Sequence, residues 1–404
     1  MITVKQAQAQ LIESLSCHQL TEVIAVDNAL GRVVAQDVIS SIMIPPNDNS
    51  AMDGFAINSE DLQGFDSQKT LIVSQRIPAG TAAEPLEKGT AARIFTGGMM
   101  PSGADAVVIQ ENCDYDSDDK VTIKKTVVSQ ENVRPAGQDI PVGKVVVIKG
   151  QRLNAIDLSL ITAVGKASVK VYKPLKVAVF STGDELAEPG DELKPGQIYN
   201  SNRTFLIALC QQMGFEAVDI GTVEDTLDAT KEALNKASAS ADFILSSGGV
   251  SVGDEDHVKP AVEALGSLDL WKVRMKPGKP VAFGQVNGVP FLGLPGNPVS
   301  SFVVFQLLAV PALQALQGQI VEFLRPFLVQ AGFNKKITSR EEYIRVQLHQ
   351  ESSDGGWIAT PYENSSSGVL TSLSWAHGLV RQEIDQEIQQ GDSLDYFALH
   401  DGLL

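Results

Sequence analysis

Two different spacings of hydrophobic residues divide the chain into regions of different structure. Residues 4–15 carry apolar side chains three and four positions apart, which predicts an amphipathic helix. Between residues 21 and 150 the pattern changes to short β-rich runs that glycine and proline separate, and it predicts β-sheet with tight turns. A further helix is expected over 153–166. The clearest of the predicted strands cover residues 21–26, 70–74, 106–110, 121–126 and 144–149.

After Pro174 apolar strands alternate with helices. This alternation predicts a doubly wound, mostly parallel α/β domain whose ligand site lies at the carboxyl ends of its strands. From about residue 320 short alternating strands return, which indicates a small C-terminal β-domain. The expected fold class is therefore multidomain, with the α/β domain between a β-rich N-terminal region and this C-terminal domain. The strands of the α/β domain are expected at 176–181, 216–223, 242–247, 271–275 and 291–294, and its helices at 201–213, after Thr226, at 256–265 and from Asn297 onward.

Composition removes several classes of function. The chain has 404 residues, of which 43% are hydrophobic and 20% charged, so a wholly disordered chain is excluded. A net charge of −17 argues against a protein whose whole surface binds nucleic acid or anionic lipid, and it leaves a local basic site open. The three cysteines are dispersed, which fits a reducing cytoplasm, and the first 15 residues do not resemble a signal peptide. The apolar stretch 299–316 contains Pro311 and two glutamines, so we expect a buried helix there and no membrane partner.

One stretch of this acidic chain has no carboxylate. Between Asp269 and Glu322 the charged residues are all cations, and two of them lie in the sequence KPGKP. Directly after them, GLPGNP at 293–298 places a glycine-rich turn before a helix, where N–H groups and the helix dipole favour an anion. The window therefore predicts an oxyanion or phosphate site, with a buried core segment and ordinary capping as the alternative. Its four cations are Lys272, Arg274, Lys276 and Lys279.

Acidic loops follow three of the predicted parallel strands. They are STGDEL at 181–186, the pair Glu224 and Asp225, and SSGGVSVGDEDHVK at 246–259. Because such loops meet at one edge of a doubly wound sheet, their carboxylates could hold a hard cation against phosphates. The alternative is tight strand–helix turns whose acids cap helices. We find no P-loop, HExxH or GxSxG motif and no pair of histidines spaced as metal ligands.

Taken together in their order, the loop motifs resemble one family. Three N-terminal motifs, PPNDNSAMDGFA, RIFTGGMMPSGADAVV and VRPAGQDI, are by spacing alone ordinary turns. Five further motifs follow them in order: FSTGDEL, GQIYNSNR, SSGGVSVGDEDHVK, KPGKPVAFG and GLPGNPVS. Together the eight motifs, which run from about residue 45 to 305, resemble those of the MoeA family of molybdopterin molybdenumtransferases. This family is related to the C-terminal domain of gephyrin. The resemblance implies insertion of molybdenum from molybdate into adenylylated molybdopterin, with Mg²⁺-dependent release of AMP.

The resemblance also assigns roles to residues of this chain. The chain departs from the family pattern at His257, at Met99 and Met100, and at Asn47. These differences affect the expected details of pterin contact. In the last domain the family's arginine falls on Arg340 or Arg345, and its serine on Ser366 or Ser367. By motif, the catalytic positions are Asp53, Thr96, Asp139, Lys276 and Lys279; the cofactor-binding positions are Gly248, Gly249, Ser251, Pro295, Gly296, Asn297, Pro298 and Ser366; and the metal positions are Glu185, Asp225 and Asp256.

The family further implies a cytoplasmic, elongated homodimer of four-domain chains. The N-terminal motifs and the lysines lie on different domains, and the resemblance implies that each site forms between the N-terminal region of one subunit and the α/β domain of the other. The alternatives are that both groups meet within one chain or that the N-terminal group is only structural. Molybdopterin adenylyltransferase and other molybdenum-cofactor proteins are the expected protein partners, and nucleic acid is not one. Two rival functions stay open, the adenylyltransferase activity itself and a non-enzymatic scaffold. The expected domains are 1–26 with 145–174 for dimerisation, an inserted β-rich domain at 27–144, the α/β molybdopterin-binding domain at 175–319, and the C-terminal β-domain at 320–404.

Overall fold

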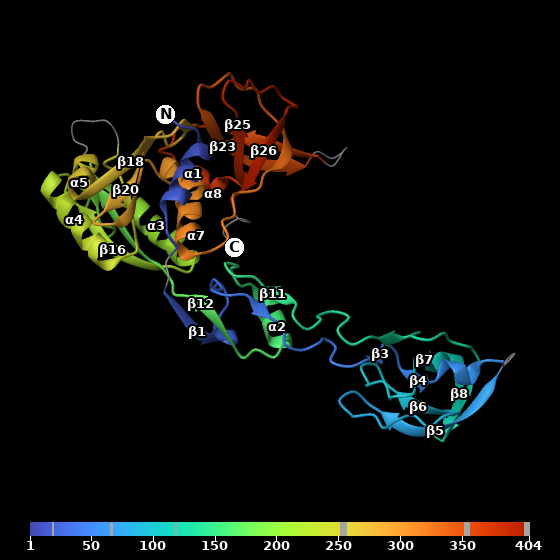
Figure 1. Ribbon diagram of the computed structural model, residues 1–404. Coiled ribbons are helices and arrows are strands. Elements are labelled where there is room, and N and C mark those ends of the chain that lie inside the picture. The colour runs from blue at the N-terminus through green and yellow to red at the C-terminus, as the bar shows by residue number, and fades with distance from the viewer. Residues whose placement is uncertain (18–19, 65–67, 118, 251–256, 351–355, 400–404) are drawn as a thin grey trace.

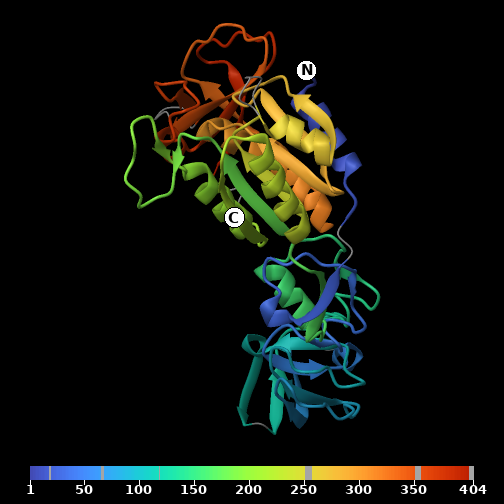
Figure 2. The ribbon, with the colours of Figure 1, turned by 90° about the vertical axis from the view of Figure 1, so that its left-hand side faces the viewer.

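The chain forms an elongated molecule with a large and a small end. The structure is a computed structural model that describes residues 1–17, 20–64, 68–117, 119–250, 257–350 and 356–399. An α/β unit and the C-terminal β-unit lie side by side at the large end, and a separate β-unit lies at the far end (Figures 1 and 2). A narrow middle segment joins them.

The far end is a six-stranded sheet in the order β7-β4-β6-β5-β9-β8. Its apolar side chains form two clusters, with Phe55 and Ile57 buried in one of them. Gly54 begins β4, the strand next to the edge strand β7, where a Cβ would lie 2.0 Å from the backbone oxygen of Val108, so only glycine permits this approach. The elements are β4 (Gly54–Ile57), η2 (Ser59–Leu62), β5 (Lys69–Ile77), β6 (Thr90–Ile94), β7 (Ala106–Ile109), η3 (Gln110–Asn112), β8 (Cys113–Ser117) and β9 (Lys120–Ile123).

Short antiparallel pairs build the middle segment. β1 (Thr21–Ala25) pairs with β12 (Ser168–Tyr172), and one apolar cluster joins the residues before β2 to those around α2. Nearer the far end β3 pairs with β10. The remaining elements are η1 (Val26–Asn28), β2 (Val38–Ile39), β3 (Asn49–Ser50), β10 (Val133–Arg134), β11 (Val145–Val147) and α2 (Ala155–Ala163).

The α/β unit contains a sheet in the order β16-β13-β17-β21-β20-β18. The first four strands are parallel and the last two antiparallel, which confirms the mostly parallel sheet. Strand β20 was not predicted, because Pro280 at its first position hides it in the sequence. The strands are β13 (Lys176–Thr182), β14 (Leu186–Ala187), β15 (Ile198–Tyr199), β16 (Glu216–Val223), β17 (Phe243–Ser247), β18 (Gly266–Lys272), β20 (Pro280–Val286) and β21 (Val289–Leu294).

The helices of this unit begin where the sequence places caps. The Thr226 side chain accepts a hydrogen bond from the backbone N–H of Ala229, and Asn297 with Pro298 begins the last long helix. That helix runs over 298–317 and is apolar enough to cross a membrane, but 94% of its most apolar window is buried inside the fold, as in a core helix. The helices are α3 (Ser201–Gln212), α4 (Leu227–Ser240), α5 (Val258–Leu265), α6 (Pro298–Val304), η4 (Phe305–Ala309) and α7 (Val310–Gln317).

The C-terminal unit is a six-stranded sheet, β19-β23-β24-β22-β26-β25, with β23 also paired to β25. Its edge strand β19 belongs in sequence to the α/β unit and pairs with β23 of the C-terminal unit. We call this pairing, which connects the two units, the strand joint. The elements are β19 (Met275–Lys276), β22 (Phe327–Ala331), β23 (Glu341–Gln350), β24 (Trp357–Pro361), α8 (Thr371–Trp375), β25 (Gly378–Gln382) and β26 (Ser393–Ala398).

The N-terminal residues pack in two different parts of the molecule. Helix α1 (Val4–Ser14) buries Val4, Ala7 and Leu11 in the core of the α/β unit, because it lies against η4 and α7. Residues from Val26 to Val38 pack with the middle segment. The domain boundaries at 27, 145, 175 and 320 stay a prediction.

Candidate functional site

Two cavities meet at the start of α6. The first, which we call the strand-end cavity, has a volume of about 720 Å³ and lies beyond the ends of β13 and β17. The second, which we call the cationic cavity, has a volume of about 620 Å³ and lies between the α/β and C-terminal units. Pro280, Pro295 and Asn297 line both of them. The turn before α6 is therefore a common wall, and one extended ligand could occupy both cavities.

Hydroxyl groups and glycines line the strand-end cavity. The hydroxyls of Ser181 and Thr182, at the end of β13, are buried and have no hydrogen-bond partner among the described residues. Gly248 has a φ of +94°, and a Cβ there would lie 2.5 Å from the backbone oxygen of Thr182. Since buried polar groups are normally satisfied, these hydroxyls indicate a polar ligand. Gly248 and Gly249, both predicted as binding residues, line this cavity.

Asn202 holds two walls of the strand-end cavity together. Its side-chain nitrogen donates to the Ser247 hydroxyl oxygen at 2.8 Å and to the Gly296 carbonyl oxygen at 2.6 Å. Helix α3 brings it there because Asn200 caps the helix, accepting a hydrogen bond from the backbone N–H of Arg203. This side chain therefore fixes the turn before α6 against the end of β17.

Two of the three predicted metal ligands share the strand-end cavity. Glu185 and Asp225 both line it, and the backbone N–H of Asp225 donates to the Asp184 carboxylate at 3.2 Å. Asp256 and Ser251 lie outside the described residues. Among the described residues no three His, Cys, Asp or Glu side chains gather as a metal cluster. The site thus supplies two carboxylates, which suits Mg²⁺, an ion that keeps several waters and binds one or two carboxylates with substrate phosphates.

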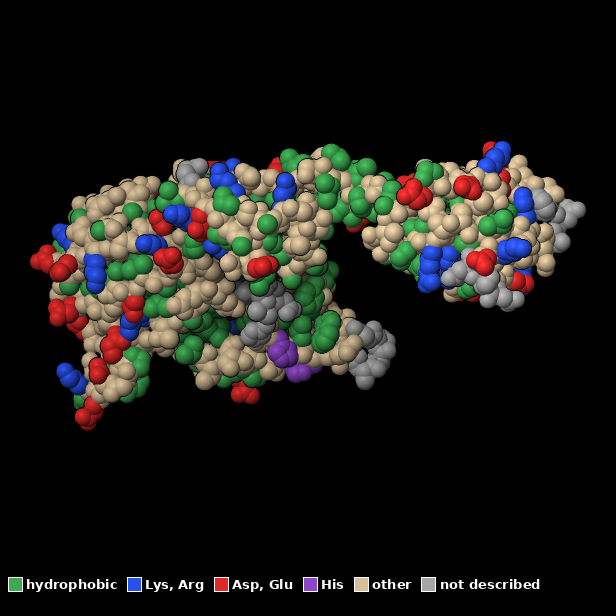
Figure 3. All heavy atoms as spheres, turned by 90° about the horizontal axis from the view of Figure 1, so that it is seen from below, with side chains coloured by type: hydrophobic (Ala, Val, Ile, Leu, Met, Phe, Trp, Pro, Cys, Tyr) green, Lys and Arg blue, Asp and Glu red, His purple; other side chains and the backbone are tan. Residues whose placement is uncertain are grey.

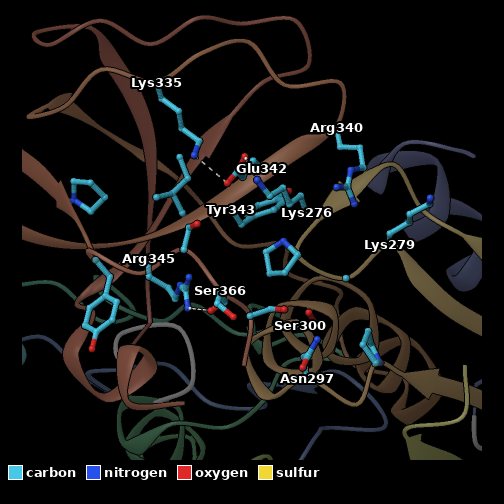
Figure 4. Close-up of a pocket in the computed structure, with 18 of the residues that line it drawn as sticks. Lys276, Lys279, Asn297, Ser300, Lys335, Arg340, Glu342, Tyr343, Arg345 and Ser366 are labelled. Atoms are coloured by element: carbon cyan, nitrogen blue, oxygen red, sulfur yellow. Dashed lines mark hydrogen bonds and ion pairs between the residues drawn. The ribbon is translucent and has the colours of Figure 1, made fainter. Parts of the chain in front are cut away.

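Cations from both units line the second cavity (Figure 4). Lys276 and Lys279, both predicted, come from the α/β unit, and three further cations come from the C-terminal unit. Two carboxylates, Glu342 and Glu363, also line it, so the cations outnumber the acids. In a chain of net charge −17 this excess is local. The three further cations are Lys335, Arg340 and Arg345.

A buried carboxylate connects two of these lysines. The Glu342 side chain is 6% exposed, and its two oxygens lie 3.2 Å from the Lys276 and Lys335 ammonium nitrogens respectively. The strand joint explains the first contact, because Lys276 of β19 stands directly opposite Glu342 of β23. The carboxylate therefore holds one cation from each unit.

Arg345 holds the loop of Ser365, Ser366 and Ser367, which we call the serine loop, at the other side of the cationic cavity. Its guanidinium is buried and donates to the Ser366 carbonyl oxygen at 3.0 Å and to the Ser372 hydroxyl at 2.7 Å. Burial lowers the pKa of Arg345, yet an arginine remains charged. The backbone N–H of Val299 in α6 donates to the Ser367 carbonyl oxygen. Since Arg340, Ser366 and Ser367 also line the cavity, both alternatives for the family's arginine and serine lie there.

The turn before α6 offers fewer N–H donors than the sequence suggested. Pro295 and Pro298 have no N–H group, and the N–H of Val299 is used by the serine loop. Gly296, Asn297 and Ser300 are left to present backbone N–H groups to an anion. The lysines must therefore provide most of the attraction.

Asp53 and Thr96 form a separate pair at the far end of the molecule. One Asp53 oxygen accepts from both the backbone N–H and the hydroxyl of Thr96, each at 2.8 Å. These hydrogen bonds lower the pKa of Asp53. Asp139 is exposed on a loop before β11. Its backbone N–H donates a hydrogen bond to the Ile44 carbonyl oxygen, and its carbonyl oxygen accepts one from the Lys144 ammonium group. Within one chain Asp53 and Thr96 lie at the opposite end from both cavities, as the positions of β3, β4 and β6 show (Figure 1). Asp139 lies nearer the middle segment, because its neighbour Ile140 packs in the apolar cluster of that segment.

Comparison with known proteins decides the family. Residues 2–165 match the model "MoeA N-terminal region (domain I and II)", residues 178–315 match "Probable molybdopterin binding domain", and residues 331–399 match "MoeA C-terminal region (domain IV)". A curated relative from Haemophilus influenzae, named molybdopterin molybdenumtransferase, is 41% identical over 320 residues, which are 79% of this chain and 78% of that relative. The chain belongs to the MoeA family.

Two further matches support the MoeA assignment. A Nostoc relative of the same name is 38% identical over 349 residues, covering 84% of this chain and 80% of its own length. The crystal structure of a molybdopterin biosynthesis MoeA protein from Pyrococcus horikoshii superposes with a TM-score of 0.82 at 31% identity, covering 98% of this chain and 99% of that one. The predicted fold class and the prediction that the chain is a transferase of this family are confirmed.

Three residues of the site were not found from the sequence. Asn202 lies in the motif GQIYNSNR, but nothing in its spacing shows that it reaches the turn before α6. Lys335 and Glu342 lie in the C-terminal unit, where the motif resemblance was weak. The strand joint that brings Glu342 to Lys276 pairs residues 66 positions apart, and no local pattern signals it.

Proposed function

We propose that the protein inserts molybdenum from molybdate into adenylylated molybdopterin and releases AMP with the help of Mg²⁺. The names of the relatives support transfer of molybdenum to molybdopterin. The observation that carries the proposal is the common wall between the strand-end cavity and the cationic cavity. A substrate that joins a nucleotide to a pterin through a phosphoanhydride is long and anionic, and it requires two adjoining pockets.

Each cavity suits one part of this chemistry. The strand-end cavity, with its hydroxyls and glycines, suits the ribose and phosphates of the nucleotide, whose oxygens can accept and donate hydrogen bonds. The cationic cavity suits molybdate, a tetrahedral dianion, beside Lys276 and Lys279. The reacting ends of both substrates would then meet at the turn before α6.

Glu185 and Asp225 would hold Mg²⁺ in the strand-end cavity, with Asp256 as the third predicted ligand. When bound there, the ion would neutralise charge that builds on the phosphates as AMP leaves. Hydrolysis of the anhydride breaks one P–O bond and adds water across it, so negative charge increases on both products. Lys276 and Lys279 lower the cost of that charge from the other side of the wall.

We also propose that the functional unit is a homodimer. Asp53 and Thr96 lie at the far end of their own chain, so they can take part only if a second chain brings them to the cavities. On the face that Figure 3 shows, apolar side chains gather over the narrow middle segment, as an interface would require. The exposed large apolar residues of this segment are Val23, Leu30, Ile39, Ile42, Met43, Val142, Val145, Ile148 and Ile156.

Subunit mixing tests the shared site. Asp53→Asn and Lys279→Ala homodimers should each be nearly inactive. In the mixed dimer one composite site carries both changes and the other carries neither, so activity should approach half of the wild-type value per dimer. If confirmed heterodimers showed no recovered activity, the residues would act within one chain or not at all.

The enzymatic proposal is tested with purified protein, adenylylated molybdopterin, molybdate and Mg²⁺. AMP should appear only when all three are present, together with molybdenum bound to the pterin. In a parallel assay with ATP and molybdopterin, consumption of ATP with formation of adenylylated pterin would instead show the adenylyltransferase activity, and no turnover in either assay would favour a scaffold. We propose that molybdopterin adenylyltransferase supplies the substrate in the cytoplasm.

A further inference from the structure

The pair of lysines around Glu342 has an arrangement that a purely structural ion pair does not need. The carboxylate is nearly fully buried, yet both of its cations line the cationic cavity. The Lys276 side chain is 41% exposed and that of Lys335 is 26% exposed, so neither lysine is buried with the carboxylate. Figure 4 shows Lys335 and Lys276 approaching Glu342 from two sides.

The two lysines come from different units of the fold. Lys276 belongs to β19, and Lys335 lies in the segment between β22 and β23 of the C-terminal unit. The isolated bridge between Lys335 and Ile388 fixes the backbone at the second lysine. The spacing between the two ammonium groups is therefore set by one buried carboxylate and two anchored backbones.

We propose that Lys335 is an anion-binding residue of the site and that Glu342 is a positioning residue that holds Lys335 and Lys276 at a fixed spacing. A long lysine side chain loses much rotamer entropy when it binds an ion, and a carboxylate that already orders it lowers that cost. A tetrahedral dianion has four oxygens and can accept from both ammonium groups at once. The ligand class is a tetrahedral oxyanion, and its identity as molybdate rests on the proposed function.

A binding role and a purely structural role of Glu342 and Lys335 predict different oxyanion affinities for variants of these residues. If Glu342 and Lys335 only joined two segments of the C-terminal unit, their loss would change stability and leave oxyanion affinity unchanged. If they present cations to the ligand, affinity for molybdate must fall more than affinity for the pterin substrate. The two readings therefore separate on one comparison of variants.

The first test replaces Lys335. Lys335→Gln should weaken molybdate binding about tenfold, as loss of one charge-assisted hydrogen bond at a partly exposed side chain implies. The KM for adenylylated pterin should change less than about twofold, and Lys335→Arg should recover part of the molybdate affinity. Lys336→Gln is the matched control, because Lys336 is the exposed neighbour and does not line the cavity. Wild-type molybdate affinity in Lys335→Gln would overturn the proposal.

The second test is a double-mutant cycle with Glu342→Gln. If Glu342 acts through Lys335, the molybdate affinity lost on Lys335→Gln should be smaller in the Glu342→Gln background than in wild type. Fully additive losses would remove the positioning role. If Glu342→Gln does not fold, the Lys335 variants alone decide the question.

Direct binding separates this inference from the proposed function. Equilibrium dialysis with radioactive molybdate measures affinity without turnover. A wild-type protein that binds molybdate but releases no AMP contradicts the proposed reaction and leaves the role of Lys335 testable. A protein that turns over normally while Lys335→Gln binds molybdate like wild type contradicts this inference alone.

Discussion

Lys276 and Lys279 line the same cavity but should respond differently to removal. Lys276 pairs with the buried Glu342, whereas Lys279 is exposed and makes no ion pair among the described residues. Both alanine variants should bind molybdate about tenfold more weakly, since each loses a cation of the site. Only Lys276→Ala should also lower the stability of the fold.

The magnitude follows from the exposure of the two partners. An exposed ion pair contributes about 0.2–1 kcal/mol, and a buried charge left without any partner costs about 3–5 kcal/mol. Glu342 is 6% exposed but keeps Lys335 at 3.2 Å when Lys276 is removed. We therefore expect Lys276→Ala to lower the free energy of unfolding by about 1–2 kcal/mol, and Lys279→Ala by no more than about 0.5 kcal/mol.

Calorimetric unfolding of the two variants beside wild type gives the stability difference, and equilibrium dialysis gives molybdate affinity. A loss of about 1 kcal/mol corresponds to a fall of about 2–4 °C in Tm for a unit of this size. Equal stability of the two variants would show that the pair with Glu342 contributes nothing. Unchanged molybdate affinity in both would contradict the anion role of the cavity.

Three other changes test the remaining parts of the site. Asn202→Leu should destabilise the fold by about 2–4 kcal/mol and weaken AMP binding, because the Gly296 carbonyl oxygen loses its buried donor; calorimetry showing no loss would remove this tether. Thr96→Val should raise the pKa of Asp53 toward its ordinary value in a carbon-13 NMR titration, since the hydroxyl donor is lost. An unmoved pKa of Asp53 in the variant would show that the Thr96 hydroxyl does not cause the shift. The stabilisation that the Asp53 carboxylate provides is present above its unfolded pKa of about 3.9, and it is lost as the pH falls through the lower pKa of the folded state. Asp225→Asn should shift the Mg²⁺ dependence of AMP release to higher concentration, and an unchanged dependence would exclude it as a ligand.

The sequence predicted local features well and long-range contacts poorly. Thr226 and Asn297 were recognised as helix starts because a cap depends on neighbouring residues. Of the four cations in the carboxylate-free window, Lys276 and Lys279 line one cavity with the turn before α6, and Lys272 and Arg274 do not line it. The counter-ion Glu342 could not be predicted, because it reaches Lys276 through a strand pairing between two units.

The placement of the N-terminal motifs could not be derived from one chain either. Asp53 and Thr96 were expected to form part of the site, and their contact with each other reflects two loops of the same sheet. Within one chain they lie at the opposite end from the lysines, so the proposed site requires a second chain. For this reason the composite site is a proposal that rests on subunit mixing.

A crystal structure of the protein soaked with AMP, Mg²⁺ and molybdate tests most directly whether the two cavities are one site. The nucleotide should bind in the strand-end cavity beside Gly248 and Gly249, and an anomalous molybdenum signal should appear in the cationic cavity beside Lys276 and Lys279. The two ligands should lie on either side of Pro295. A molybdenum signal elsewhere, or AMP bound away from the ends of β13 and β17, would show that the two cavities are not one site.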